Sequence, residues 1–178
     1  MPRLFTGLEI PADVASELSL LRGGLRGARW IDPENYHITL RFIGDIDDAT
    51  ARDVEDILSE VRRGGFELRI DGLSSFGGRR PRALVATVGP SQTMVELQAE
   101  HERLMRRVGL EPESRKFTPH VTLARFRDTS SMEVADYLSA RPMFRPLPFK
   151  VSRFLLFSSR ASTGGGPYVV EAAYPLAA

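Results

Sequence analysis

The chain has 178 residues, a formal net charge of +1 at pH 7 and 26% charged residues, values typical of a soluble globular protein with one domain or two small lobes. No run of 18 apolar residues occurs and the N-terminus lacks a signal-peptide pattern, so we expect no membrane span and a cytoplasmic location. Cysteine is absent, which excludes disulfides and thiolate metal sites.

The predicted elements occur in the same order twice along the chain. Helices are predicted where apolar residues recur at spacings of three and four, and strands where β-branched and apolar residues run together. The first set comprises strand 3–10, helix 12–25, strand 36–43, helix 47–63 and strand 66–72. The second comprises strand 83–89, helix 91–108, strand 119–126, helix 131–140 and strand 147–157, and a last strand at 167–174 follows a hairpin loop at 164–166.

The second set copies the first at a shift of 83 residues. This shift places His37-Ile38-Thr39-Leu40 on His120-Val121-Thr122-Leu123, and residues 66–70 on 149–153. Self-similarity at a fixed shift indicates an internal repeat. We therefore predict a single domain made of two pseudo-repeats, at about 1–76 and 82–178, which the glycine- and arginine-rich segment 77–82 joins.

The two copied phrases each place a histidine and a threonine two residues apart on a strand. Residues i and i+2 of a strand share a face. His37 and Thr39 should therefore point the same way, as should His120 and Thr122, while the apolar residues between them face the core. A cleft between the two strands would then present two imidazoles and two hydroxyls.

Three kinds of chemistry use a pair of histidines, and the sequence favours one of them. A zinc site is disfavoured because the chain has three histidines, no cysteine and no His-Glu-x-x-His helix. A serine nucleophile is disfavoured because no Gly-x-Ser-x-Gly elbow occurs. Acid–base catalysis at phosphorus remains: a neutral imidazole takes a proton from water, an imidazolium protonates the leaving oxygen, and threonine hydroxyls hold phosphate oxygens, without a metal or a cofactor.

At this point the residues carry a resemblance to a known family. The two phrases resemble the paired His-x-Thr-x signatures of the 2H phosphoesterase superfamily. Flanking phrases resemble its bacterial and archaeal RNA 2′,3′-cyclic phosphodiesterase branch, the LigT-like proteins historically called 2′-5′ RNA ligases; these are Arg29-Trp30, residues 35–44, Arg80-Pro81-Arg82, residues 115–125, 157–160 and 165–168. The resemblance covers nearly the whole chain. Val85 departs from it, because a tryptophan is expected there in many relatives.

The resemblance implies a fold, a reaction and roles for the paired residues. The fold would be α+β and bilobal, with two antiparallel sheets flanking a central cleft and helices outside. The reaction would be hydrolysis of a terminal 2′,3′-cyclic phosphate of RNA to a 2′-phosphate by a monomer. His37 would be the proton donor and His120 the proton acceptor, with Thr39 and Thr122 on the phosphate; the near symmetry of the two halves does not decide which histidine does which. Another 2H reaction (a different cyclic phosphate, or 2′-5′ ligation) and a non-catalytic RNA-binding module are the alternatives.

Four further residues are candidates for substrate binding. Alternation places Arg41 on the face of His37, where it could contact phosphate or the RNA backbone. Phe42 matches a family aromatic that could stack on a base, and Arg125 could reach an anion, but alternation turns both away from the cleft unless strand twist intervenes. Lys116, next to Arg115, could guide an anionic end toward the second motif.

Three other side chains are given structural roles. Trp30 and Tyr36 are predicted to pack in the core. His101 lies in a helical stretch without a threonine partner, and we predict that it is a surface residue.

Overall fold

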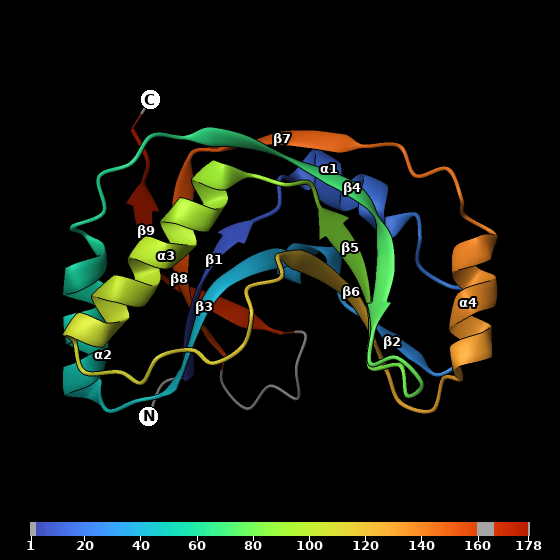
Figure 1. Ribbon diagram of the computed structural model, residues 1–178, viewed down its shortest axis with the longest axis horizontal. Coiled ribbons are helices and arrows are strands. Elements are labelled where there is room, and N and C mark those ends of the chain that lie inside the picture. The colour runs from blue at the N-terminus through green and yellow to red at the C-terminus, as the bar shows by residue number, and fades with distance from the viewer. Residues whose placement is uncertain (1–2, 160–165, 178) are drawn as a thin grey trace.

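The computed structural model describes residues 3–159 and 166–177, which form an α+β fold (Figure 1). Within these ranges nine strands and four α-helices occur, with one short 3-10 helix, η1 (Pro33–Asn35). The strands are β1 (Arg3–Glu9), β2 (Ala28–Trp30), β3 (His37–Asp45), β4 (Phe66–Phe76), β5 (Ala83–Val88), β6 (His120–Phe126), β7 (Leu147–Val151), β8 (Arg153–Ser159) and β9 (Tyr168–Pro175). The α-helices are α1 (Ala12–Ser19), α2 (Asp48–Leu58), α3 (Gln92–Arg107) and α4 (Ser131–Ser139).

Every predicted helix and strand is present, but several differ in extent. Helix α1 ends at Ser19 rather than near residue 25, since the chain then passes through Gly23 and Gly24, whose φ angles of 96° and 77° do not continue a helix. The predicted strand 147–157 is two strands, β7 and β8, separated at Ser152. Strand β2 was not predicted. The predicted loop at 164–166 has its first two residues outside the described part of the chain.

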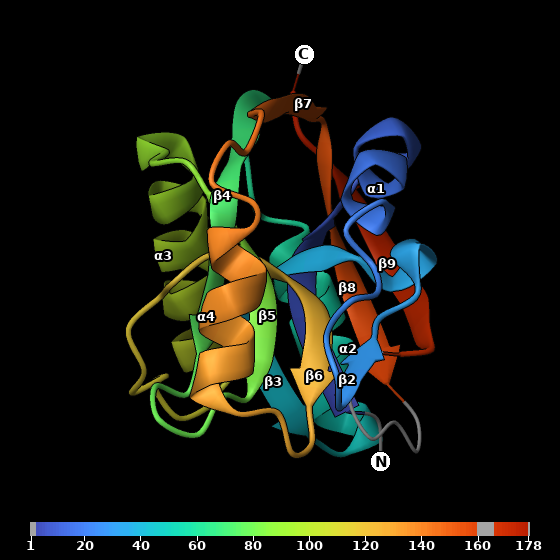
Figure 2. The same ribbon diagram turned by 90° about the vertical axis from the view of Figure 1, so that its right-hand side faces the viewer.

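The strands form one antiparallel sheet in the order β7-β4-β5-β6-β3-β1-β8-β9, with β2 added alongside β6. Its two halves meet at β3 and β6, which are paired in register only at Ile38 and Val121. The two predicted sheets are therefore joined at one point, between the two His-x-Thr phrases. Figures 1 and 2 show the helices outside this sheet, with α2 and α3 on one side and α4 on the other.

A β-bulge follows each His-x-Thr phrase. On β3, Thr39 is opposite Gly7 but Arg41 is opposite Thr6, so Leu40 is an extra residue. On β6, Thr122 is opposite Val85 but Ala124 is opposite Leu84, so Leu123 is extra. An extra residue reverses the faces of all residues after it. The simple alternation that placed Arg41 in the cleft and Phe42 and Arg125 outside it is therefore wrong.

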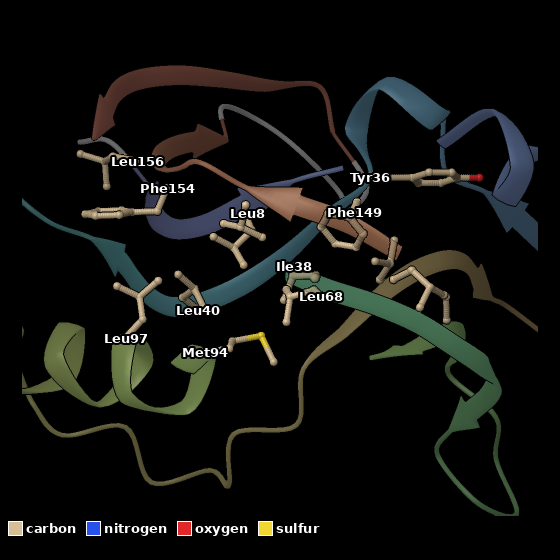
Figure 3. Close-up of a cluster of buried hydrophobic side chains, with 14 of the residues drawn as sticks. Leu8, Tyr36, Ile38, Leu40, Leu68, Met94, Leu97, Phe149, Phe154 and Leu156 are labelled. Carbon is tan, nitrogen blue, oxygen red and sulfur yellow. The ribbon is translucent and has the colours of Figure 1, made fainter. Parts of the chain in front are cut away.

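The residues between the paired histidines and threonines belong to the core, as predicted. Ile38 and Val121 are fully buried, and Leu40 and Leu123 are nearly so. Figure 3 shows Ile38 and Leu40 lying between Leu8 on one side and Met94 and Leu97 of α3 on the other. Burial of these apolar side chains fixes β3 and β6 against the core. The paired histidines and threonines lie on the opposite face of these strands.

The predicted packing roles of Tyr36 and Trp30 are confirmed, since Tyr36 is buried and Trp30 packs against the core. The surface position predicted for His101 is wrong. Its side chain is fully buried, with Nδ1 2.9 Å from the Thr6 hydroxyl and its ring against Phe154. Because burial disfavours the charged imidazole, the pKa of His101 falls to about 3.

None of the helices in the described ranges combines the length and the apolar character that a membrane crossing requires.

Candidate active site

A cleft of about 240 Å³ lies over the junction of β3 and β6. The paired residues of both phrases line it, so the two halves of the sheet bring His37, Thr39, His120 and Thr122 together. The remaining lining residues are Arg3, Phe5, Ile31, Asn35, Phe42, Arg125, Ser159 and Tyr168. The cleft is thus walled by rings at one side and carries arginines at its edges.

The imidazole of His37 is held by hydrogen bonds at both nitrogens. Nδ1 lies 2.9 Å from the carbonyl oxygen of Asn35, where η1 ends. A carbonyl only accepts, so Nδ1 carries a hydrogen and donates it. Nε2 of the neutral ring is then the acceptor, and the Thr39 hydroxyl, 3.0 Å away, donates to it.

His120 is held in the same way by the residue two positions before it. Its Nδ1 lies 2.7 Å from the carbonyl oxygen of Thr118 and donates to it. Pro119, between the two, favours the extended backbone at Thr118. The neutral ring therefore also has its lone pair on Nε2, the nitrogen available to a bound molecule in the cleft. The same local arrangement therefore fixes both neutral histidines in the same tautomer, with the hydrogen on Nδ1.

Aromatic side chains surround the two imidazoles. The His37 ring lies 5.0 Å from both Phe5 and Tyr168 and 5.7 Å from Phe157, measured between centroids. This apolar burial is the main reason that the pKa of His37 falls to about 4, with the charges of His120 and Arg125 as further causes.

His120 is more open but shares these effects. Its ring meets the edge of Phe76 at 4.6 Å between centroids. Burial lowers its pKa, and the charge of Arg125 lowers it further. Both imidazoles are therefore mostly neutral at pH 7 when the cleft is empty.

The structure places two of the four candidate binding residues in the cleft. Phe42 and Arg125 line it, because the bulges on β3 and β6 turn them to the face of the histidines. Lys116 is exposed but does not line the cleft. Val85 is fully buried and does not line it either.

Arg41 lies in the protein interior, away from the cleft. Its side chain is buried and pairs with Glu102 of α3, with Nε 2.6 Å from the carboxylate. Its other nitrogens donate to the carbonyl oxygens of Glu111, at 2.5 Å, and Phe42. Arg41 therefore joins β3 to α3 and to the segment that precedes His120.

Several lining residues were not singled out from the sequence. Asn35 carries a usable signal, because it precedes His37 by the same two positions as Thr118 precedes His120. Arg3 and Phe5 carry none, since only the pairing of β1 with β3 brings them beside the motif, whereas Ser159 lies in the phrase 157–160 that resembles the family. No group of three His, Asp or Glu residues arranged to bind a metal ion occurs in residues 3–159 and 166–177.

The chain is similar in sequence to known proteins. The family model described as LigT like Phosphoesterase matches the chain twice, at residues 8–87 and 85–168. An RNA 2′,3′-cyclic phosphodiesterase of Aquifex aeolicus is 32% identical over 150 residues, which span 80% of this chain and 78% of that protein. One of Thermotoga maritima is 27% identical over 94% of this chain and 92% of its own length. One of Aeropyrum pernix is 35% identical over 104 residues, 57% of this chain and 59% of that protein.

Solved structures show the same fold. A protein of Thermus thermophilus superimposes with a TM-score of 0.80 at 23% identity, covering 98% of this chain and 97% of its own. E. coli LigT, crystallised with 3′-AMP, superimposes with a TM-score of 0.77 at 23% identity over 99% of both chains.

Proposed function

We propose that this chain, which belongs to the LigT-like phosphoesterase family, is a phosphodiesterase that opens the 2′,3′-cyclic phosphate at the end of an RNA strand. The single observation that carries the proposal is the matched pair of imidazoles. Each is held through Nδ1 by a backbone carbonyl, which leaves Nε2 as the proton-accepting nitrogen of the neutral ring, and both rings line one cleft. The relatives named RNA 2′,3′-cyclic phosphodiesterase supply the substrate class.

In the proposed reaction a water oxygen attacks phosphorus while Nε2 of His120 accepts its proton. The bond between phosphorus and O3′ breaks as Nε2–H of His37 donates a proton to O3′. The products are a 2′-phosphomonoester and a free 3′-hydroxyl. Overall, His37 has lost a proton and His120 has gained one. In-line displacement places the attacking and leaving oxygens on opposite sides of phosphorus, which matches two histidines on two different strands.

The threonines and Arg125 would hold the phosphate between the histidines. In the empty cleft the Thr39 hydroxyl donates to Nε2 of His37. Once that nitrogen carries a proton, it no longer accepts, and the hydroxyl is released to donate to a phosphate oxygen. Arg125 lines the same cleft and offers a guanidinium suited to phosphate oxygens.

A bound phosphodiester would also favour the protonated form of His37 that the reaction needs. With a pKa of about 4 in the empty cleft, His37 is almost entirely neutral at pH 7. A nearby anion favours the charged imidazole and raises its pKa. The phosphate also offsets the charge of Arg125, which lowers the pKa of both histidines in its absence. Substrate binding thus favours the protonated His37 that acts as the acid.

The test uses a short RNA that ends in a 2′,3′-cyclic phosphate, incubated with the protein in the presence of a chelator. We expect a 2′-phosphate as the product, identified by its phosphorus NMR signal, with no requirement for added metal. A 3′-phosphate product would contradict the assigned leaving group. Loss of activity in the chelator with recovery on adding a divalent metal would contradict metal independence, and an unchanged substrate under all conditions would contradict the proposed function.

A further inference from the structure

Five exposed arginines occur on two neighbouring segments beside the cleft, the end of β6 and the turn between β4 and β5. We call these five residues the arginine tract and define it as Arg79, Arg80, Arg82, Arg125 and Arg127. All five side chains are exposed. Arg125 lines the cleft, Arg127 follows at the end of β6, and the other three lie on the turn between β4 and β5. Figure 1 shows this turn near the end of β6; β5, which follows the turn, pairs with one side of β6, and β2 pairs with the other side.

Backbone hydrogen bonds tie these segments into one surface. The amide of Phe126 donates to the carbonyl of Arg82 at 2.9 Å, and the amide of Arg127 donates to the carbonyl of Gly27 at 3.1 Å. The turn itself is closed by bonds from Arg80 to Gly77 and from Arg82 to Phe76. The arginines therefore project from a common, ordered base.

The start of the turn is also in contact with His120. Phe76, at its start, packs against the ring of His120 at 4.6 Å between centroids. Arg125 is in register with Ala83, the first residue after the turn, and with Arg29 of β2 on its other side. The positive charge of the tract thus continues to the wall of the cleft, where Arg125 already influences both histidines.

In the described part of the chain, the tract arginines have no carboxylate partners, in contrast to many of the arginines elsewhere in the molecule. Nine arginines elsewhere in the described ranges form ion pairs with Asp or Glu. Within the same ranges no carboxylate forms an ion pair with any of the five tract arginines, and Asp128 is the acidic residue next to them in sequence. Arg3, which also lines the cleft, is paired with Asp45. Of the two arginines that line the cleft, Arg125 is therefore the one without an ion pair in the described ranges.

We propose that the arginine tract binds the phosphodiester backbone of the RNA strand on the 5′ side of the reacting nucleotide. This inference rests on the proposed function. A 2′,3′-cyclic phosphate can occupy only the 3′ end of a strand, so the rest of the strand must leave the cleft in the 5′ direction across the adjoining surface. Guanidinium groups bind phosphate oxygens through paired hydrogen bonds and release counterions as they do so. The tract is the surface next to the cleft that has the charge for this role.

The consequence is a preference for oligonucleotides over a mononucleotide. A nucleoside 2′,3′-cyclic phosphate has no upstream phosphate and can use only the cleft. Each added nucleotide offers the tract another phosphate until the tract is covered. We expect kcat/KM to rise with length from one nucleotide to about eight, within the range of single-strand binding sites, and this gain to shrink as salt is raised.

Two double variants of equal charge change test the tract. R79A/R80A removes two tract arginines from the exposed turn. R52A/R103A removes two exposed arginines from α2 and α3, on the other side of the molecule. For each protein, kcat/KM is measured for a nucleoside 2′,3′-cyclic phosphate and for an oligonucleotide with the same end. The ratio of the two values should fall about tenfold in R79A/R80A and stay at the wild-type value in R52A/R103A.

Equilibrium binding gives a readout that does not depend on catalysis. The probe is a fluorescently labelled oligonucleotide ending in a 2′-phosphate, with its anisotropy followed at increasing KCl concentrations. The slope of log Kd against log salt should be shallower for R79A/R80A than for wild type by about 0.7 per lost phosphate contact. Equal kcat/KM ratios and equal salt slopes in the two double variants would overturn the proposal that the arginine tract binds RNA. No hydrolysis by wild type, together with the expected change in slope, would overturn the proposed function and leave the tract supported.

Discussion

At the scale of single residues, the chemistry of the cleft is prepared by two backbone carbonyls. Asn35 and Thr118 each accept from Nδ1 of the histidine two positions later, which leaves both Nε2 atoms as the reactive nitrogens. A histidine placed in the cleft without this contact would divide its population between two tautomers. The His-x-Thr phrase therefore needs the residue two places before it as much as the threonine two places after it.

Replacing the histidines should abolish most of the activity while leaving the fold intact. We expect His37→Ala and His120→Ala each to lower kcat by at least ~10²-fold, the effect of losing a general acid or base. The double variant should be little worse than either single one, because the two act as a unit. Thr39→Ala and Thr122→Ala should each lower kcat about tenfold, equivalent to one phosphate hydrogen bond. Steady-state kinetics with thermal unfolding as the check on folding decides this, and near-wild-type turnover in either histidine variant would refute the assignment.

The pH dependence should reveal the lowered pKa values directly. The active form holds one proton on the pair, so activity falls at low pH when the base is protonated and at high pH when the acid is not. Because kcat/KM reports the free enzyme, its bell should be centred below pH 6.5, between a value near 4 and the lowered pKa of His120. The kcat profile should lie at higher pH, since bound phosphate raises both pKa values. Rates at low and at saturating substrate over about pH 4–9 measure both profiles.

The same profiles assign the two roles. Residual activity of His120→Ala should lose the acid limb, and that of His37→Ala the alkaline limb. The reverse pattern would exchange donor and acceptor. A flat wild-type profile, with chemistry shown to be rate-limiting, would reject a mechanism based on two histidines.

At the scale of elements, strand alternation and helical spacing predicted the helices, the strands and the faces of the paired residues. The sequence did not predict features that depend on which residues of neighbouring strands are hydrogen-bonded to each other. The faces of His37 and Thr39 follow from the two-residue period of a strand. The face of Arg41 does not, because Leu40 is an extra residue in the pairing of β3 with β1. The apolar run 147–157 gives no sign that Ser152 separates two strands with different neighbours.

His101 shows a signal that was present but given too little weight. It follows Leu97 by four residues and precedes Leu104 by three, so it lies on the apolar stripe of α3. The helical period places it in the core, and its polar character argued for the surface. The hydroxyl of Thr6 on β1 resolves the conflict by satisfying one ring nitrogen, a partner that no local pattern in the sequence identifies.

The Arg41–Glu102 pair should contribute much more to stability than a surface pair of equal length. Side-chain exposure is 6% for Arg41 and 17% for Glu102, against 47% and 44% for Arg153 and Glu9, and both pairs have a 2.6 Å contact. Removing Arg41 takes the nearest partner from the largely buried Glu102 carboxylate, which keeps Arg106 at 3.8 Å and the Glu113 amide. It also leaves the carbonyl oxygens of Phe42 and Glu111 without this donor. Arg41→Ala should therefore lower the free energy of unfolding by about 3–5 kcal/mol, and Arg153→Ala by less than about 1 kcal/mol. Urea denaturation of the two variants measures this, and equal losses would contradict it.

At the scale of the whole molecule, each half of the sheet is built from strands of both predicted pseudo-repeats. Strand β4 belongs to the first predicted pseudo-repeat but pairs only with β5 and β7, which belong to the second. Strand β8 belongs to the second but pairs with β1. Near the C-terminus, the amide of Ala177 donates to the carbonyl of Arg63, and its carbonyl accepts from Gly65. The two repeats therefore exchange strands, so that both halves of the sheet beside the cleft at β3 and β6 contain strands from each repeat.

This exchange predicts that the two halves cannot fold separately. Cutting the chain in the turn between β4 and β5 gives fragments 1–78 and 79–178; the first has β4 without either of its partners, and the second has β8 without β1. Each fragment alone should expose the apolar side chains of these strands and show no cooperative thermal unfolding by circular dichroism. An equimolar mixture should recover strand structure and the proposed phosphodiesterase activity. All the strand pairings can form again, and only the covalent link in the turn is missing. Cooperative unfolding of either fragment by itself would contradict the exchange and would show that one repeat is a folding unit.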